Sequence, residues 1–425
     1  MDKLQIEGGI PLNGKVRISG AKNAALPLMT TSLLTDQPVV LENIPKLSDI
    51  KTLGGVLTSL GVSVFISEGS TADKLILQSD HLNSVHADYE LVRKMRASIL
   101  VLGPLVARHG KAEVSLPGGC ALGTRPVDLH IKGLEKMGAT IALEDGYIRA
   151  QAPKGGLRGT DIAFPLISVT GTENLMMAAT LGQGTTRLIN AAREPEVVDL
   201  ANCLVSMGAK ISGAGTDTIT IEGVPSLKGT THSVLPDRIE TGTYIVAAAI
   251  TKGCLELTHT SLELLPTFKS LAEDAGICFE PTADGFKVYN HKNLLQTKSV
   301  DMITEPYPGF PTDLQAQFMA LMAFADGSST ITETIFENRF MHVAELARMG
   351  ADIQIHGSSA IVKGKKELVG APVMATDLRA SACLVLAGLA AKGTTTVNRI
   401  YHLDRGYETM EKKLQACGAK IERIA

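Results

Sequence analysis

The sequence predicts an α/β protein with two similar domains, each built from three repeated strand-helix units of about 70 residues. Three observations lead to this prediction. The chain has 425 residues, which is too long for one ordinary hydrophobic core. A short pattern centred on glycine recurs six times, and a second pattern recurs at the same period. Because one such unit is too small to close a large core alone, we expect the six to group as two sets of three.

The first pattern is a leucine, three residues, a glycine and then a short apolar stretch. Its copies are "LTSLGVSV" (57–64), "LEKMGATI" (134–141), "LVSMGAKI" (204–211), "LARMGADI" (346–353), "LQACGAKI" (414–421) and a looser "LAEDAGICF" (271–279). The marker glycines are Gly61, Gly138, Gly208, Gly276, Gly350 and Gly418, spaced by 77, 70, 68, 74 and 68 residues. A glycine just past a helix end allows the left-handed conformation that ends the helix.

The second pattern is an apolar helix-like run, a turn residue and a β-branched strand. Clear copies are "MMAATLGQGTTRLINAA" (176–192), "YIVAAAITKGCLELTH" (244–259), "LMAFADGSSTITET" (321–334) and "LVLAGLAAKGTTTVNRI" (384–400). Around one marker glycine, Val127, Ile131 and Leu134 share a helical face. Pro126 suits the first position of that helix. Each unit therefore reads as strand, helix, strand, helix, strand, and the alternative is an ordinary large α/β protein with chance similarity.

Composition excludes several classes of protein. A formal charge of -3 argues against a nucleic-acid binder, which needs a basic face. No apolar run approaches the ~20 residues that cross a bilayer, so we expect no membrane insertion and a cytoplasmic protein. The six cysteines show no metal-binding spacing, and we expect neither a metal nor a cofactor. No glycine-rich nucleotide motif is present, so any phosphate would be bound by side-chain cations.

Several cations lie beside glycines or at expected helix starts. A single surface arginine is usually solvated, but a converging set of guanidinium groups suits phosphate and carboxylate. Helix starts add backbone N–H groups that favour anions. The candidates are Lys22 with Asn23, then Arg93, Arg96, Arg125, Arg339, Arg379 with Asp377, and Arg405.

Cys120 differs from the other five cysteines. Cys203, Cys254, Cys278, Cys383 and Cys417 lie in apolar stretches, where burial is expected. Cys120 lies in the glycine-rich "SLPGGCALGTRPVD" (115–128), close to a cation that can tune its thiol. A buried small residue and a reactive thiol both remain open from local evidence.

Asp313 in "YPGFPTDLQAQF" (307–318) also has two interpretations. Asp313 or Thr312 could cap a helix that starts at Leu314, which local evidence favours. A carboxylate held behind two prolines is also well placed as a rigid base.

Long motifs along the whole chain resemble the enolpyruvyl transferases, and within them the members that use UDP-N-acetylglucosamine. The motifs are "SGAKNAALP", "LPGGCALGTRPVDLH", "AAREPEVVDLAN", "VLPDRIETGTY", "FPTDLQAQF", "TETIFENRFMHV" and "MATDLRASACLVLAG". The resemblance implies an inside-out α/β barrel of two domains. One would span 22–235, the other 1–21 with 236–425, and the active site would lie in the cleft between them.

The resemblance also implies a reaction. The enolpyruvyl group of phosphoenolpyruvate passes to the 3-hydroxyl of UDP-N-acetylglucosamine by addition and elimination, with release of phosphate, as the first committed step of peptidoglycan synthesis. Lys22, Arg125 and Arg405 would hold phosphoenolpyruvate and stabilise developing charge. Asn23 would position the sugar hydroxyl and Asp313 would take its proton. Cys120 would give a proton to the methylene carbon and could form a covalent phosphoenolpyruvate adduct.

Further roles follow from the same resemblance. Arg96, Arg339, Asp377 and Arg379 would support the site and domain closure. Contacts to the sugar nucleotide would come from Asn23, Arg96, Arg125, Pro126, Val127, Asp128, Leu129, Ser168, Val169, Asp313 and Ile335. One segment departs from the family, which often has Ser-Val-Gly-Ala-Thr where this chain has "SVTGT" (168–172).

Two rival functions remain. A sister enolpyruvyl transferase would act on shikimate 3-phosphate, but the Cys120 segment and "ENRFMH" resemble the sugar-nucleotide enzymes. A noncatalytic sugar-nucleotide sensor would bind without turnover, which the full set of Lys22, Cys120, Asp313 and Arg405 disfavours. The sequence does not indicate an oligomeric state.

Overall fold

The computed structural model describes residues 2–67, 74–116, 127–291 and 296–425. Within them the chain divides into two compact units. The terminal unit holds the residues up to Ser19 and Pro236–Ala425, and the inserted unit holds the described residues from Gly20 to Leu235. Each unit has its own hydrophobic core.

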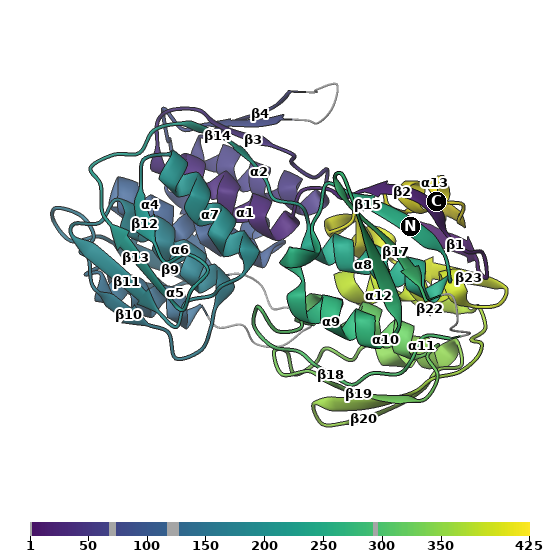
Figure 1. The fold of residues 1–425 in the computed structure, drawn as a ribbon. Coiled ribbons are helices and arrows are strands. Elements are labelled where there is room, and N and C mark those ends of the chain that lie inside the picture. The colour runs from purple at the N-terminus through teal and green to yellow at the C-terminus, as the bar shows by residue number, and fades with distance from the viewer. Residues whose placement is uncertain (1, 68–73, 117–126, 292–295) are drawn as a thin grey trace. The chain divides into compact units, whose positions relative to one another are not determined.

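The described part of the chain forms six four-stranded sheets with one shared topology (Figure 1). In every sheet an edge strand runs parallel to its neighbour and the other two pairings are antiparallel. The six predicted repeats are thereby confirmed. The expected unit lacked one strand. In five sheets the second helix leads into a hairpin of two strands, and in the sixth it leads into Lys420–Ile424, which pairs with Lys3–Glu7 from the other end of the chain.

The inserted unit contains three of these sheets. In spatial order, the strands of the first sheet are β14 (Thr230–Ser233), β3 (Val39–Glu42), β5 (Lys74–Gln78) and β4 (Ser63–Ser67). Those of the second are β6 (His86–Ala87), β7 (Lys111–Ser115), β9 (Tyr147–Gln151) and β8 (Thr140–Glu144). Those of the third are β10 (Asp161–Ala163), β11 (Thr185–Ile189), β13 (Thr218–Glu222) and β12 (Lys210–Ser212). The helices are α1 (Lys22–Thr30), η1 (Thr31–Leu34), α2 (Ser48–Leu60), α3 (Tyr89–Val92), η2 (Arg96–Val101), α4 (Leu102–His109), α5 (Asp128–Lys136), α6 (Val169–Thr180) and α7 (Pro195–Ser206), where η marks a 3-10 helix.

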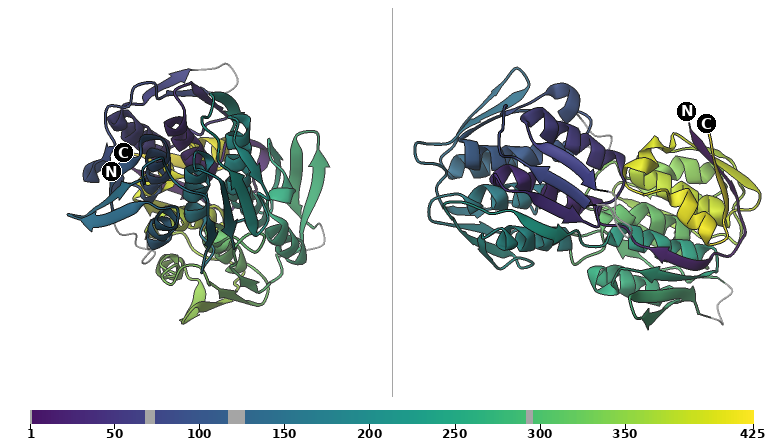
Figure 2. Two further views of the ribbon diagram at one scale, coloured as in Figure 1. Left: turned by 90° about the vertical axis from the view of Figure 1, so that its left-hand side faces the viewer. Right: turned by 90° about the horizontal axis from the view of Figure 1, so that it is seen from above.

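The terminal unit contains the other three. The strands of its first sheet are β2 (Asn13–Arg17), β15 (Cys254–Thr258), β17 (Gly285–Asn290) and β16 (Ile277–Thr282). Those of the second are β18 (Met302–Ile303), β19 (Ser328–Thr332), β21 (Ser359–Lys363) and β20 (Asp352–His356). Those of the third are β22 (Pro372–Met374), β23 (Thr394–Asn398), β1 (Lys3–Glu7) and β24 (Lys420–Ile424). Its helices are α8 (Arg238–Ile250), η3 (Leu262–Leu264), α9 (Pro266–Asp274), η4 (Thr312–Leu314), α10 (Gln315–Met322), α11 (His342–Arg348), α12 (Leu378–Ala390), η5 (Ile400–Arg405) and α13 (Met410–Ala416). Both chain ends lie in one sheet, where β1 pairs with β24 (Figure 2).

The helices of each unit fall into two kinds. The first helix of each repeat is buried nearly all round, as in α6, α8, α10 and α12, which accounts for their continuous apolar sequences. The second helix, such as α7 or α9, buries one face only. Helices therefore form the centre of each unit and sheets its outside, the arrangement expected of an inside-out barrel (Figure 1).

The six marker glycines end the second helix of each repeat, as predicted. All six lie in the left-handed region, with φ between 91° and 104°. There a side chain would strain the backbone. These glycines let the chain leave the helix and enter the antiparallel edge strand of each sheet.

Candidate active site

Asp313 is held by two arginines of the terminal unit. It lies in η4, just before α10. Its Oδ1 accepts a hydrogen bond from Arg339 Nη2 at 2.7 Å, and its Oδ2 accepts from Arg379 Nη2 at 2.7 Å and Nε at 3.1 Å. The Asp313 side chain keeps 24% of its exposure, whereas those of Arg339 and Arg379 keep 6% and 4%. The structure thus brings three of the predicted residues together. A carboxylate that is partly accessible to water is fixed by two buried guanidinium groups.

The ion pairs decide the charge of Asp313. Burial acts to raise the pKa of its carboxyl group, but the charges of Arg379 and Arg339 outweigh burial and hold that pKa well below its usual range. Asp313 is therefore ionised at neutral pH. The helix-capping interpretation is wrong, because neither Thr312 nor Asp313 caps a helix and α10 begins at Gln315 rather than at Leu314.

A buried glutamate that the sequence did not single out supports the same cluster. Glu333 Oε2 accepts from Thr312 Oγ1 at 2.8 Å, and Thr312 Oγ1 accepts in turn from Arg339 Nη1 at 2.8 Å. Glu333 Oε1 accepts from the backbone N–H groups of Ile335 and Phe336 at 2.8 and 3.1 Å. Glu333 thereby connects the turn that carries Ile335 to the turn that carries Asp313.

Asp377 acts on the backbone at the start of α12. Its Oδ1 accepts from the N–H groups of Arg379 and Ala380 at 2.8 and 3.0 Å, which makes it the N-cap of this helix. The cap fixes the first turn of α12 and therefore the point from which Arg379 reaches Asp313. The supporting role of Asp377 stays a prediction, and this cap is the contact through which Asp377 would act.

Arg405 is the last residue of η5 and is half-buried. Burial and the nearby Arg405 charge both lower the pKa of His402. His402 is therefore neutral at physiological pH, and the Arg405 guanidinium contributes positive charge in the same terminal unit as Asp313.

In the inserted unit, Lys22 and Asn23 begin α1. Lys22 is only 9% exposed, and its Nζ lies 3.3 Å from Asp49 Oδ2 on α2. Asn23, the next residue, is exposed. A buried ammonium group that pairs with the Asp49 carboxylate, beside an exposed amide, suits the recognition of an anionic ligand at this helix start.

Besides Asn23, the described residues of this unit that are predicted to contact the sugar nucleotide lie at three further helix starts. Asp128 begins α5 and pairs with Lys132 at 3.1 Å, while Val127 and Leu129 pack partly against the core. Arg96 begins η2. Burial and the charge of Arg96 lower the pKa of His130 to about 4, so this histidine is neutral at physiological pH.

Ser168 and Val169 form the third helix start. Ser168 is the N-cap of α6, and its Oγ accepts from Gly171 N at 3.1 Å. A Cβ at Gly171 would lie 2.8 Å from Ser168 Oγ. Gly171 therefore lies close to the cap, and the structure gives no reason for the departure of "SVTGT" from the family pattern.

Cys120, Arg125 and Pro126 lie outside the described residues. Among the other cysteines, Cys203, Cys383 and Cys417 are buried as expected. Cys254 and Cys278 are only half-buried, so the prediction of burial is wrong for them. Both stand opposite Tyr289 in the ladders of β15 and β16 with β17, in strands whose side chains alternate between core and outer face.

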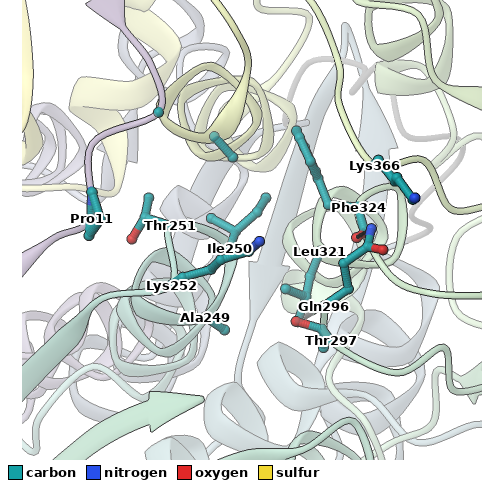
Figure 3. A pocket seen from close by; sticks show the side chains of 12 residues that line it. Pro11, Ala249, Ile250, Thr251, Lys252, Gln296, Thr297, Leu321, Phe324 and Lys366 are labelled. Atoms are coloured by element: carbon teal, nitrogen blue, oxygen red, sulfur yellow. Dashed lines mark hydrogen bonds between the residues drawn. The ribbon is translucent and has the colours of Figure 1, made fainter. Parts of the chain in front are cut away.

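The terminal unit also has a pocket at the C-terminal ends of its central helices, whereas Asp313 and Asp377 lie at N-terminal ends. It has a volume of about 220 Å³, and its lining includes Ile250, Leu321 and Ala390, near the C-termini of α8, α10 and α12 (Figure 3). Helix C-termini carry partial negative charge, which disfavours anions. Lys252 and Lys366 lie at this pocket and offset that charge. The pocket contains none of the predicted site residues.

Within the described ranges, no group of three or more His, Cys, Asp or Glu side chains is arranged to hold a metal ion. No described helix is long and apolar enough to cross a membrane.

The comparisons with known proteins cover the full chain. Residues 6–414 match the model of the family described as EPSP synthase (3-phosphoshikimate 1-carboxyvinyltransferase). A protein of Rhodospirillum centenum named UDP-N-acetylglucosamine 1-carboxyvinyltransferase is 59% identical over 100% of this chain and 99% of its own. A protein of the same name from Paracoccus denitrificans is 58% identical, again over 100% of this chain and 99% of its own.

Solved structures agree in fold. The enolpyruvyl transferase NikO from Streptomyces tendae has a TM-score of 0.88 at 26% identity and covers 100% of this chain and 99% of its own. EPSP synthase from Acinetobacter baumannii has a TM-score of 0.77 at 18% identity, with both chains fully covered. The chain belongs to the enolpyruvyl transferase family that includes EPSP synthase.

Proposed function

We propose that this member of the enolpyruvyl transferase family moves the enolpyruvyl group of phosphoenolpyruvate to the 3-hydroxyl of UDP-N-acetylglucosamine and releases phosphate. Its relatives at 57–59% identity over the full chain bear the name of that activity. The observation that carries the chemistry is the Asp313 carboxylate, which is ionised, partly open to water and fixed by two buried arginines.

The addition step needs a base and a proton donor. The sugar oxygen forms a bond to C2 of phosphoenolpyruvate, Asp313 takes the hydroxyl proton, and a proton adds to the methylene carbon to give a tetrahedral intermediate. Two guanidinium groups make Asp313 a weak base, so it removes the proton only as C–O bond formation acidifies the hydroxyl. Cys120 is the proposed donor to the methylene carbon, and its thiolate can also bond to phosphoenolpyruvate.

The elimination step reverses the proton transfer at the methyl carbon. That carbon loses a proton, the C2–O bond to phosphate breaks, and phosphate leaves with its electron pair. Lys22, Arg125 and Arg405 are proposed to hold the phosphate and carboxylate of the substrate and to balance the charge that develops. In this assignment Lys22 and Arg125 belong to the first predicted domain, residues 22–235, and Arg405 belongs to the second.

Recognition of the sugar nucleotide is proposed to rest on backbone and side chains at helix starts. Asn23 would orient the reacting hydroxyl. The other proposed contacts are Arg96, Arg125, Pro126, Val127, Asp128, Leu129, Ser168, Val169, Asp313 and Ile335. Ser168 and Asp128 support this proposal because they begin α6 and α5, where backbone N–H groups favour phosphate.

Both substrates are polyanions, which do not cross a bilayer unaided because transfer of charge into hydrocarbon is costly. We therefore place the reaction in the cytoplasm, at the first committed step of peptidoglycan synthesis. The residues present require no cofactor for the steps described.

A phosphate-release assay with two acceptors tests the proposal. Purified protein with phosphoenolpyruvate should release phosphate when UDP-N-acetylglucosamine is added and not when shikimate 3-phosphate is added. Release with shikimate 3-phosphate alone would establish the sister activity instead. Tight binding of UDP-N-acetylglucosamine without any phosphate release would favour the sensor.

A further inference from the structure

The Tyr407 side chain lies where several elements of the terminal unit meet. Tyr407 follows η5, two residues after Arg405, and is buried at 2% exposure. Its hydroxyl contacts Thr243 on α8, Gln317 on α10 and Arg379 on α12. None of these contacts is required by the steps of the proposed reaction.

The directions of these hydrogen bonds are fixed by their neighbours. Thr243 Oγ1 donates to the carbonyl of Ile239 at 2.8 Å, so its own proton is used and it accepts from the Tyr407 hydroxyl at 2.8 Å. The Tyr407 oxygen in turn accepts from Gln317 Nε2 at 3.1 Å and from Arg379 Nη1 at 3.3 Å. The hydroxyl therefore donates once and accepts twice, which is its full hydrogen-bonding capacity.

Two of these contacts continue to Asp313. Gln317 Nε2 also donates to the backbone carbonyl of Asp313 at 2.9 Å. Arg379 donates to the Asp313 carboxylate through Nη2 and Nε, while its guanidinium carbon lies 5.7 Å from the centre of the Tyr407 ring. Tyr407 thus supports both the backbone and the ion pair of Asp313 through one intervening side chain in each case.

The chain between Arg405 and Tyr407 is closely packed. The backbone N–H groups of Gly406 and Tyr407 both donate to the carbonyl of Leu403 at 3.0 Å. A Cβ at Gly406 would lie 2.7 Å from the side chain of Leu378, so the absence of a side chain brings this turn close to the start of α12. With Tyr407 anchored on one side of Gly406, the backbone of Arg405 is fixed on the other.

We infer that the Tyr407 hydroxyl is a positioning group, which holds the turn bearing Arg405 against the Asp313–Arg379 ion pair. The inference rests on the proposed function, because it concerns the roles of Arg405 toward phosphoenolpyruvate and of Asp313 as base. Burial raises the pKa of Tyr407, so its hydroxyl remains protonated and can donate to Thr243 at physiological pH.

The test is Tyr407→Phe, with Tyr244→Phe as the matched control. Tyr244 is the residue after Thr243, is fully buried, and its hydroxyl has no hydrogen-bond partner among the described residues. Both changes remove one buried hydroxyl and leave the ring. Phosphate release is measured with each substrate varied in turn, together with the melting temperature of each variant.

Tyr407→Phe should lower kcat at least tenfold and raise KM for phosphoenolpyruvate at least fivefold, with KM for UDP-N-acetylglucosamine within twofold of wild type. Tyr244→Phe should keep kcat and both KM values within twofold of wild type. A purely structural role would lower the melting temperature or kcat without moving KM for phosphoenolpyruvate, and that result would overturn the inference. So would equal kinetics for the two variants.

A second variant covers the case in which Tyr407→Phe does not fold. Thr243→Val keeps the tyrosine but removes the acceptor for its hydroxyl proton, and it should raise KM for phosphoenolpyruvate about threefold. An unchanged KM would overturn the inference. If the wild-type protein released no phosphate with UDP-N-acetylglucosamine, the proposed function would fail and the inference with it. Normal wild-type turnover with unchanged variants would overturn the inference alone.

Discussion

Replacement of Asp313 by asparagine removes both the proposed base and the anion of two buried ion pairs, and kcat and the free energy of unfolding report these two losses separately. The amide keeps the shape of the carboxylate but cannot take a proton and carries no charge. Loss of a positioned general base typically costs about 10²–10⁴-fold in rate, and we expect kcat of Asp313→Asn to fall in that range. The same change leaves Arg339 and Arg379 buried without their anion.

The stability cost can be estimated from the geometry. Removal of one partner of a buried pair costs about 3–5 kcal/mol, because the remaining charge has been taken out of water. Asp313 is 24% exposed, so water can reach the edge of this cluster and the lower end applies. We expect the free energy of unfolding to fall by about 3 kcal/mol, measured by urea denaturation at pH 7.

Two further variants test the cost of leaving the two arginines without their anion. Arg339→Met in the Asp313→Asn background removes one of the unpaired charges, and it should restore about half of the lost stability, roughly 1.5 kcal/mol, without restoring turnover. Asp161→Asn breaks an exposed pair with Arg187 and should cost no more than about 1 kcal/mol. If Asp313→Asn kept kcat within tenfold of wild type, Asp313 would not be the base. If it lost no stability, the two ion pairs would contribute nothing in solution.

Three other predictions concern the thiol, a buried histidine and a helix cap. Cys120→Ala should abolish covalent labelling by a phosphonate epoxide, and mass spectrometry that still finds one adduct per chain would identify a different cysteine. His130 has its pKa lowered from 6.5 to about 4, so the unfolded chain binds the extra proton between these values. The stability that the neutral His130 ring contributes is complete above about pH 6.5 and is lost as pH falls toward 4. His130→Gln should therefore reduce the slope of the unfolding free energy against pH in that window by about 1.4 kcal/mol per pH unit. An unchanged slope would count against a neutral buried ring. Ser168→Ala should cost about 1 kcal/mol of stability and raise KM for UDP-N-acetylglucosamine, whereas a changed KM for phosphoenolpyruvate alone would contradict the proposed role of this helix start.

The fold was predictable because each repeat contains its own local signals. A buried first helix, a β-branched strand and a glycine with positive φ recur within each unit, and none of them depends on distant residues. The missed strand of the hairpins is the central one, as in β9 and β13, where buried residues alternate with more exposed ones in the period of two that is typical of a half-buried strand. The half-buried exposure of Cys254 and Cys278 was missed because an apolar neighbourhood in sequence does not indicate which face of a strand a residue occupies.

The site was predictable only in part, because its electrostatics depend on contacts between distant segments. Asp313 looked like a cap when it was considered with Thr312 alone, yet its partners lie 26 and 66 residues further along the chain. Glu333 lies in "TETIF", where no local pattern indicates that its carboxylate accepts four hydrogen bonds.

The hydroxyl of Tyr407 and its threonine partner are separated by 164 residues. A motif can identify which charged groups take part in the chemistry. The neutral residues that hold those groups in place become visible only where the repeats of one unit meet, at the starts of the buried helices α10 and α12. Those helix starts are provided by the fold, so in this chain the repeat architecture determines where a base and its counter-charges can be placed.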